Sequence, residues 1–387
     1  MKITEIRDIV VPIKSEISNA FISFSEMTVS AVAVHTDVQH DGKPVVGFGF
    51  HSNGRYAQQG ILRERIIPRL MQASPSAFAN ESGGNIDPEK AWTVMMTNEK
   101  PGGHGDRSVA VGTVDMALWD AAAKIEGKPL YQVLSERYRG GTVDRTVCVY
   151  AAGGYYYPGK DISALTEEMR SYLAQGYTTV KMKIGGAPLA HDLERIEAVL
   201  KLLPSGEHLC VDANGRFDRQ TALDYAKALA PYRLRWYEEP GDPLDFKLLA
   251  EVAAASETPI ATGENLFSAV DSRNLIRYGG LDHETDFLQM DPALSYGIVE
   301  YERTLKMLGE EGWSRTRCIP HGGHQMALHA AAGLGLGGNE SYPGVFLPFG
   351  GFADDLPVGD GKVKLSDAPG IGIEHNSDLY AVFQTML

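Results

Sequence analysis

Three short apolar segments end in an acidic residue and recur at a constant interval. The segments HLCVD, LRWYE and PIATGE end at Asp212, Glu238 and Glu264, and 26 residues separate each acid from the next. A parallel strand, a helix and two short loops fill about that length. The spacing therefore predicts consecutive βα units whose strand ends, and with them the three acids, meet at one rim of a barrel.

Polar residues extend this ladder in both directions along the chain. Upstream, Lys181 and Lys183 lie two apart in KMK and therefore share one face of a strand. Downstream, the next apolar runs end at Asp291, His321 and Glu340. A single polar residue after a strand commonly caps the following helix, but capping does not explain seven such strand ends in succession. The ladder predicts a polar rim at the carboxyl ends of the strands, where barrel enzymes build their active sites.

Strand-like and helical segments alternate strictly from about residue 142 to the run GGNES at 337–341. Eight strand candidates and seven intervening helices make one barrel of the (β/α)7β TIM-like kind. The seven helices are expected at about 161–175, 188–203, 218–231, 245–255, 269–278, 296–311 and 325–334.

The first part of the chain has a different order of elements. Three β-rich runs, with a turn at HDGKP between the second and third, precede helical patterns at about 59–72, 88–98 and 108–126. Strands followed by helices predict an α+β capping domain rather than a part of the barrel. The expected fold class is therefore α/β, a (β/α)7β TIM-like barrel with an N-terminal α+β capping domain. We place the cap at 1–127, the barrel at 128–345 and a C-terminal segment that packs back on the cap at 346–387.

Charge and hydropathy argue against several kinds of partner. The net charge is −14 and no basic run occurs, which argues against nucleic acid and anionic membranes. The N-terminal segment MKITEIRDIVVPIKSEI is interrupted by charges, and no apolar run reaches 18 residues, so we expect neither a signal peptide nor a membrane span. Cys148, Cys210 and Cys318 lie in short apolar runs, and we expect buried free thiols in a cytoplasmic protein.

The three acids at the rim form a candidate metal site. Asp212, Glu238 and Glu264 would supply three carboxylates, with no cysteine and no histidine cluster beside them. Hard oxygen ligands favour one Mg²⁺, completed by water and substrate, over zinc. Glu239 follows Glu238 directly and should point to the opposite face of its strand, so we expect a structural role for it. Lys183, at the end of the neighbouring strand, is placed to act as a base.

The KMK strand, the Asp–Glu–Glu triplet, the later Asp–His pair and the front α+β domain resemble the enolase superfamily, in its mandelate racemase-like branch. Five segments resemble the D-tartrate dehydratase family within that branch: NEKPGGHG (98–105), YAAGGYYYPGK (150–160), VKMKIGGAP (180–188), ALSYG (293–297) and CIPHGGHQM (318–326). The resemblance implies a Mg²⁺-dependent carbon–oxygen lyase that removes water from a small hydroxy acid. It also implies a homo-oligomer.

Each group at the rim then has an expected role in the reaction. Lys183 would abstract the α-proton, with its pKa depressed by the charges of Lys181 and Mg²⁺. Lys181 would stay charged and contact the substrate carboxylate. His321 would protonate the departing hydroxyl while Asp291 fixes its orientation. Glu340 would, if protonated, hydrogen-bond the developing enolate. From D-tartrate this elimination gives oxaloacetate.

The capping domain is expected to choose the substrate. A diacid has a second carboxylate that needs a cation away from the metal, and Lys100 in the Gly-rich segment NEKPGGHG is the candidate. By resemblance to D-tartrate dehydratases, Asn19, Asn53 and Tyr155 are expected to contact the substrate.

Other functions remain open. The same Lys–His pair could racemise an acid, or dehydrate a longer acid sugar such as galactarate or gluconate. A noncatalytic barrel that only binds ligands would not need the whole ladder of charged strand ends. A hydrolytic zinc enzyme would prefer histidine ligands, and only one of the predicted strands ends in histidine.

Overall fold

The computed structural model describes residues 1–13 and 15–387. Its first unit is an antiparallel sheet in the order β1 (Ile3–Pro12), β2 (Thr28–His40) and β3 (Lys43–Phe50). Asp41 and Gly42 join β2 to β3 with φ values of 50° and 75°. Two consecutive left-handed residues are typical of the tight hairpin turn that the segment HDGKP predicted.

The long helix α4 (Asp106–Ile125) packs directly on this sheet. Gly47 and Gly49 make the close approach possible: a Cβ atom would lie 2.1 Å from the carbonyl oxygen of Ala117 at Gly47, and 2.2 Å from that of Thr113 at Gly49. The predicted helix at 59–72 consists of three continuous pieces, α1 (Gln59–Ile61), a π turn (Leu62–Ile66) and α2 (Ile67–Gln72). The remaining helices before the barrel are α3 (Pro88–Met95) and α5 (Leu130–Tyr138).

The second unit is the parallel barrel that the ladder predicts. Its first six strands pair in chain order, and the last strand, β10, returns to pair with β4. This closure confirms the expected (β/α)7β TIM-like fold with a separate N-terminal cap. The strands are β4 (Thr146–Gly153), β5 (Val180–Lys183), β6 (Leu209–Asp212), β7 (Trp236–Glu238), β8 (Ile260–Thr262), β9 (Phe287–Leu288) and β10 (Asn339–Ser341).

The seventh position in the barrel is an extended segment rather than a full strand. It is held to β9 by a bridge between Leu288 and Cys318 and by a hydrogen bond from the Ile319 amide to the Leu288 carbonyl at 2.9 Å. On its other side the Gly337 amide donates to the Cys318 carbonyl at 3.0 Å. The segment carries His321 to the rim.

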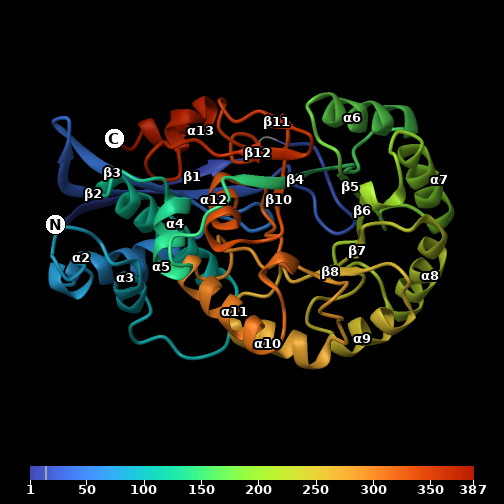
Figure 1. The fold of residues 1–387 in the computed structure, drawn as a ribbon, viewed down its shortest axis with the longest axis horizontal. Coiled ribbons are helices and arrows are strands. Elements are labelled where there is room, and N and C mark those ends of the chain that lie inside the picture. The colour runs from blue at the N-terminus through green and yellow to red at the C-terminus, as the bar shows by residue number, and fades with distance from the viewer. Residues whose placement is uncertain (14) are drawn as a thin grey trace.

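Helices surround the barrel (Figure 1). Their bounds follow the predicted ranges to within a few residues. They are α6 (Ile162–Ala174), α7 (Leu189–Leu200), α8 (Arg219–Leu229), α9 (Phe246–Ala255), α10 (Ala269–Tyr278), α11 (Ile298–Glu310) and α12 (Gln325–Leu334). Helices α6 to α9 lie on the side away from the cap, and α11 and α12 lie next to α3, α4 and α5, the helices that precede the barrel (Figure 1). Short 3₁₀ turns lie at Pro75–Ala77, Gly206–His208, Ala230–Tyr232, Arg315–Arg317 and Ile373–His375.

The C-terminal segment contacts both units. The hairpin of β11 (Val358–Gly359) and β12 (Lys362–Lys364) adds antiparallel to β4 of the barrel. The final helix α13 (Ser377–Gln384) packs on the cap sheet, with the rings of Phe383 and Phe48 4.8 Å apart. The domain boundaries after 127 and 345 stay a prediction.

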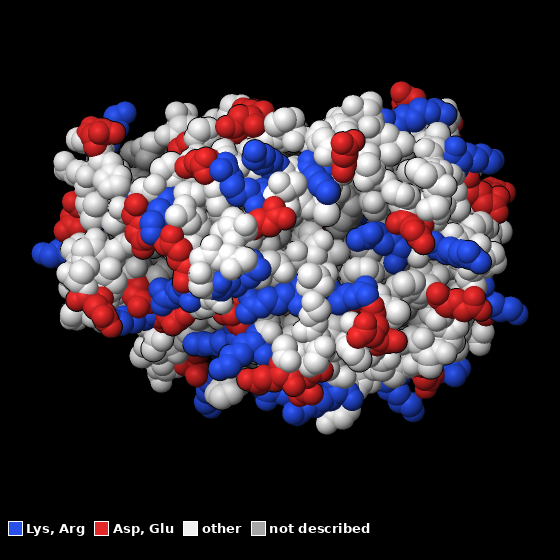
Figure 2. All heavy atoms as spheres, viewed as in Figure 1, with Lys and Arg blue, Asp and Glu red and all other residues white. Residues whose placement is uncertain are grey.

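Acidic and basic side chains alternate over the face of the molecule shown in Figure 2. Among the described residues, no helix combines the length and apolar character needed to cross a membrane. Cys210 and Cys318 are buried, but Cys148 is exposed, contrary to the sequence prediction. The buried and exposed residues alternate in the first half of β4, and Cys148 falls on the outward face.

Candidate active site

Strand register brings Asp212 and Glu238 together at the rim, whereas a turn after β8 brings Glu264 to them. Lys183, Asp212 and Glu238 are direct neighbours in the register of β5, β6 and β7. Glu264 does not share that register, because Glu238 pairs with Ala261 and Gly263, with a φ of 121°, turns the chain beyond the end of β8. Oxygen atoms of Asp212, Glu238 and Glu264 nevertheless lie within 4.8 Å of one another.

Neighbouring donors fix the two buried acids of this cluster. The backbone amide of Asn214 donates to Asp212 Oδ1 at 2.8 Å. Glu238 Oε2 accepts from Trp236 Nε1 at 2.7 Å and from Gln289 Nε2 at 2.9 Å. These bonds hold both carboxylates in defined orientations without a ligand.

The acidic cluster fits a hard divalent cation. Burial and the Asp212 carboxylate raise the pKa of Glu238 to about 8, a sign that negative charge is in excess here. Glu264 Oε2 is buried and has no hydrogen-bond partner among the described residues. Three carboxylates with an unsatisfied oxygen are the donor set of a Mg²⁺ or similar site, not of a zinc site.

Lys181 and Glu340 lie beneath the acids rather than in the cavity. Lys181 is completely buried and pairs with Glu238 at 2.6 Å, Glu340 at 2.7 Å and Asp212 at 3.4 Å. Burial alone would raise the pKa of Glu340, but the Lys181 charge lowers it below its ordinary value. The Lys181 contact therefore favours the charged form of Glu340 and argues against the protonated donor that the sequence suggested. Lys181 pairs with carboxylates and does not line the cavity, and its contact with a substrate stays a prediction.

Lys183 stands at the edge of the cavity with Asp212 as its partner. Burial and the Lys181 charge lower the pKa of Lys183, but the Asp212 carboxylate outweighs them and raises it above its ordinary value. The Lys181 charge alone therefore does not depress the pKa of Lys183 while Asp212 is in contact, and the depression expected from Lys181 together with Mg²⁺ stays a prediction. The ammonium also lies 5.0 Å from the ring centre of Tyr155.

His321 and Asp291 form the second reactive pair. Asp291 Oδ2 accepts from His321 Nδ1 at 3.0 Å, which leaves Nε2 at the cavity. Burial would lower the pKa of His321, but the charges of Glu264 and Asp291 raise it to about 9. His324 Nδ1 accepts the Ala327 amide at 3.2 Å, and its Nε2 lies 3.5 Å from the other oxygen of Asp291.

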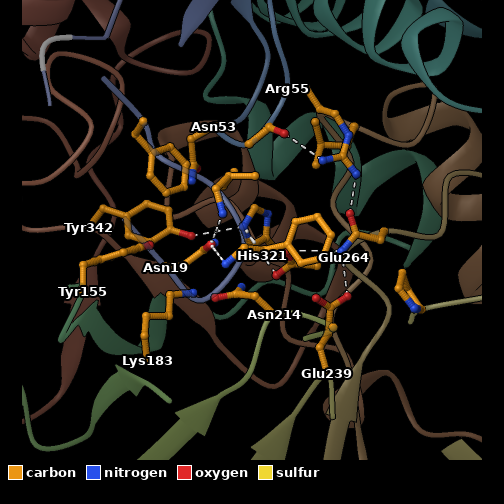
Figure 3. A pocket seen from close by; sticks show the side chains of 18 of the residues that line it. Asn19, Asn53, Arg55, Tyr155, Lys183, Asn214, Glu239, Glu264, His321 and Tyr342 are labelled. Carbon is orange, nitrogen blue, oxygen red and sulfur yellow. Dashed lines mark hydrogen bonds and ion pairs between the residues drawn. The ribbon is translucent and has the colours of Figure 1, made fainter. Parts of the chain in front are cut away.

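A cavity of about 280 Å³ lies over the rim and is lined by both units (Figure 3). Of the predicted substrate contacts, Asn19, Asn53 and Tyr155 line it, together with Lys183, His321 and Glu264. Asn19 Oδ1 accepts two amides of its own loop at 2.8 Å. Lys100 does not line the cavity; it is exposed, and its carbonyl accepts from Arg107 at 3.0 Å.

Several residues that line the cavity were misplaced or not singled out from the sequence. Glu239 faces inward because its φ of 41° breaks the strand alternation on which its predicted outward position depended. The Tyr342 hydroxyl lies 3.1 Å from His321 Nε2. Tyr342 follows the run NES without a break, so its proximity to Glu340 was the only available signal. The other new lining residues with polar side chains are Arg55, Asn214, Asp242 and Asn265.

Helix α7 holds the end of the Lys183 strand. Arg195 donates to the Lys183 carbonyl at 2.9 Å, to the Gly154 carbonyl at 2.9 Å and to Asp192 at 2.8 Å. Asp192 in turn accepts the Gly185 amide at 2.6 Å. Both side chains are buried, so a charged pair on α7 fixes the backbone on either side of Ile184.

Comparison with known proteins identifies one matching family model and several similar enzymes. Residues 164–379 match the family model described as enolase C-terminal domain-like. The chain is 30% identical to the L-talarate/galactarate dehydratase of Salmonella typhimurium, over 84% of this chain and 76% of that protein. It is 29% identical to the arabinonate dehydratase of Saccharolobus solfataricus, over 69% and 71%.

Solved structures extend the likeness to nearly the whole chain. A racemase from Streptomyces coelicolor with bound magnesium has a TM-score of 0.78 and 25% identity, covering 96% of both chains. An L-talarate/galactarate dehydratase variant with Mg and L-glucarate has a TM-score of 0.76 and 26% identity, covering 95% of this chain and 87% of that one. The shared fold includes the cap as well as the barrel.

Proposed function

The chain belongs to the enolase superfamily, in its mandelate racemase/muconate lactonizing branch, and on this premise we propose that it is a Mg²⁺-dependent acid-sugar dehydratase. One observation carries the proposal: Lys183 and His321 line the same cavity as Glu264, from the second and seventh positions of the barrel. A base and an acid at two sides of one substrate suit the removal of a proton and a hydroxide from adjacent carbons.

The residues of the chain divide the proposed reaction between them. Asp212, Glu238 and Glu264 would hold Mg²⁺, which supplies positive charge to stabilise a carboxylate that becomes a dianion. With the Asp212 carboxylate turned to Mg²⁺, its effect of raising the pKa of Lys183 would be reduced. Lys183, as the neutral amine, would then take the α-proton, and the C–H electron pair passes into an enediolate. His321 Nε2 then gives a proton to the β-hydroxyl, the C–O bond breaks and water leaves. The enol product tautomerises to a 2-oxo acid.

D-Tartrate is the substrate we propose, with oxaloacetate as product. A cavity of about 280 Å³ lies near the lower end of the usual range for ligand sites, which favours a four-carbon diacid. The amides of Asn19 and Asn53 and the hydroxyl of Tyr155 line that cavity and suit a ligand with two hydroxyl groups. The segments that resemble D-tartrate dehydratases add to this support.

Galactarate or L-talarate is the second candidate substrate. It is favoured by the 30% identity to a dehydratase named for those two six-carbon diacids. A panel of D-, L- and meso-tartrate, galactarate, L-talarate, arabinonate and gluconate, incubated with Mg²⁺, separates the candidates through the 2-oxo acid formed. We expect turnover of D-tartrate to exceed that of every other acid. Preferred turnover of galactarate would reject the D-tartrate assignment and keep the dehydratase.

Racemisation is tested in the same incubations by running them in D₂O. Recovery of inverted, deuterated substrate with no 2-oxo acid would reject the dehydratase proposal.

Metal analysis of the purified protein tests the cofactor: we expect activity that is lost with a chelator and restored by Mg²⁺. Tightly held zinc that supports hydrolysis would reject Mg²⁺ as the cofactor.

A further inference from the structure

Arg55 presents a positive charge to the cavity from the loop that follows β3. It is half-buried and lines the cavity. Figure 3 shows it at the opposite end of the view from Lys183, with Glu264 and Glu239 along one side. The α-carbon of a substrate belongs near Lys183, so Arg55 faces the end of the ligand away from Lys183. It lies on the Glu264 side of the cavity, where the Asn265 amide that it contacts also lies 3.4 Å from Glu264 Oε1.

The guanidinium of Arg55 lacks an anionic partner. Among residues 1–13 and 15–387, no carboxylate lies within 4.0 Å of its nitrogens. Its hydrogen bonds go to two neutral acceptors, the Gly54 carbonyl at 2.7 Å and the Asn265 side-chain oxygen. The ring of Phe267 lies 5.1 Å from the guanidinium carbon. A guanidinium has five N–H donors, so most of them remain available to an anion.

Neutral contacts of this kind orient an arginine without cancelling its charge. Asn265 accepts from Arg55 and donates to Glu239 at 2.7 Å, so its amide is fixed on both sides. The planar fork of an arginine matches a carboxylate in two parallel hydrogen bonds. A carboxylate at this position would meet a charge that is already held in place, at small cost in side-chain entropy.

We propose that Arg55 binds the distal carboxylate of the substrate and so selects dicarboxylic acids. The inference rests on the proposed function for the position of the reacting carboxylate. It assigns to Arg55 the contact that the sequence suggested for Lys100, whose side chain is exposed and does not line the cavity.

The test compares two ligands that differ only in the distal group, (R)-malate and (R)-2-hydroxybutyrate. Their dissociation constants are measured by calorimetry with Mg²⁺ present, on the full chain carrying Lys183→Met so that neither ligand is consumed. In that background, Arg55→Met is expected to weaken malate binding roughly 10- to 100-fold, the usual loss for a charge-assisted pair. Binding of 2-hydroxybutyrate should change less than about twofold, because it has no group for Arg55.

Lys100→Met is the matched control and should leave both dissociation constants unchanged. Arg55→Lys, which keeps the charge but loses the fork, should weaken malate binding less than Arg55→Met. Because Arg55→Met could disturb the loop, its thermal unfolding is compared with that of Arg55→Lys.

Three results would overturn the proposal. An equal loss of affinity for both ligands would show that Arg55 only holds Asn265 in place. A selective loss in Lys100→Met alone would return the distal contact to Lys100. No preference for malate over 2-hydroxybutyrate in the Lys183→Met parent would remove the dicarboxylate site altogether. These binding measurements do not depend on turnover. A selective loss of malate affinity in Arg55→Met would support the distal contact even if no acid sugar yields a 2-oxo acid. The absence of a 2-oxo acid would reject only the dehydratase.

Discussion

Lys183 and His321 have separable tasks in the proposed reaction, and single substitutions can separate them. Lys183→Met should abolish both exchange of the α-proton and formation of the 2-oxo acid. His321→Asn should abolish the 2-oxo acid but keep part of the exchange, because Lys183 still reaches the α-carbon. We expect turnover to fall by roughly 10³-fold or more in each.

Both activities are measured in one experiment, by mass spectrometry of substrate and product recovered from D₂O. Near-normal 2-oxo acid formation by either variant would remove that residue from the mechanism. Loss of exchange in both variants would show that the two residues act as one unit, and the division of roles would be wrong.

The Tyr342 hydroxyl lies 3.1 Å from His321 Nε2 at the cavity, and Glu264 Oε2 lies 3.6 Å from the same nitrogen. We expect Tyr342→Phe to lower kcat about tenfold with little change in KM, because the imidazole loses one of the two bonds that fix its plane. Tyr177→Phe is a matched control. It also removes a buried hydroxyl, which bonds to Ser341 Oγ at 2.7 Å but does not line the cavity. Equal effects of the two substitutions on kcat would reduce Tyr342 to a structural residue.

At the residue scale, prediction from sequence succeeded where periodicity decides. Asp212 and Glu238 follow from strand register alone, and Glu264 comes to the same place although its strand has ended. Glu239 could not be placed, because a left-handed φ at a non-glycine residue leaves no signature in the sequence. Arg55 could not be placed either. Its position depends on how the cap loop folds over the barrel, which local pattern does not encode.

At the scale of elements, α7 and β5 behave as one unit around the base. Arg195 on α7 bonds the carbonyl of Lys183, and a shift of about 1 Å in a catalytic group can cost 10²-fold in rate. Arg195→Met should therefore lower kcat by tenfold or more and change KM little, with partial rescue by Arg195→Lys. Kinetics on a reacting acid sugar check this.

Arg170 on α6 provides the control for that prediction. Its side chain is 57% exposed and pairs with Glu167 at 3.5 Å on the surface, so Arg170→Met should leave kcat unchanged. A change in KM alone for Arg195→Met, or a large fall in thermal stability with normal kcat, would mean that the pair supports the fold without positioning Lys183.

Elements were predictable because helices and strands alternate with strong periodicity. The seven barrel helices were found from sequence, and the bounds of α10 and α12 matched their predicted ranges. The seventh strand was predicted as an ordinary strand from the apolar run that ends at His321. In the structure it is a single bridge at Cys318. The length of a strand depends on backbone pairing with its neighbours, and an apolar run in the sequence does not reveal that pairing.

At the scale of the whole molecule, single buried groups join the cap to the barrel. Asp115 on α4 accepts the Ile298 amide at 2.7 Å and so caps helix α11 of the barrel. Gly297 makes room for it, since a Cβ there would lie 2.1 Å from Asp115 Oδ2. Such contacts cross the boundary that the sequence placed after residue 127. Composition and periodicity suggest a boundary of this kind but carry no information on the contacts across it.

His329 connects three parts of the molecule and sets an acid limit on its stability. It lies on α12, its Nδ1 accepts the amide of Tyr131 on α5 at 3.2 Å, and the backbone of Ile371 in the C-terminal segment lies beside it. Burial lowers the pKa of His329 from 6.5 to about 3. As the pH falls below about 6.5, the unfolded chain binds a proton that the folded chain rejects, so the free energy of unfolding decreases.

That loss amounts to about 1.4 kcal/mol per pH unit down to the folded pKa, or on the order of 2 kcal/mol between pH 7.5 and pH 5. His329→Gln keeps an acceptor for the Tyr131 amide but does not titrate. The free energy of unfolding is measured with urea at pH 7.5 and at pH 5. The difference between the two values should be smaller in the variant by about this amount, whatever its stability at pH 7.5. His191→Gln, at a 50% exposed position on α7, should keep the parent's difference. An unchanged difference in His329→Gln would mean that the three parts separate before His329 is protonated, and that the cap, barrel and C-terminal segment do not unfold as one unit.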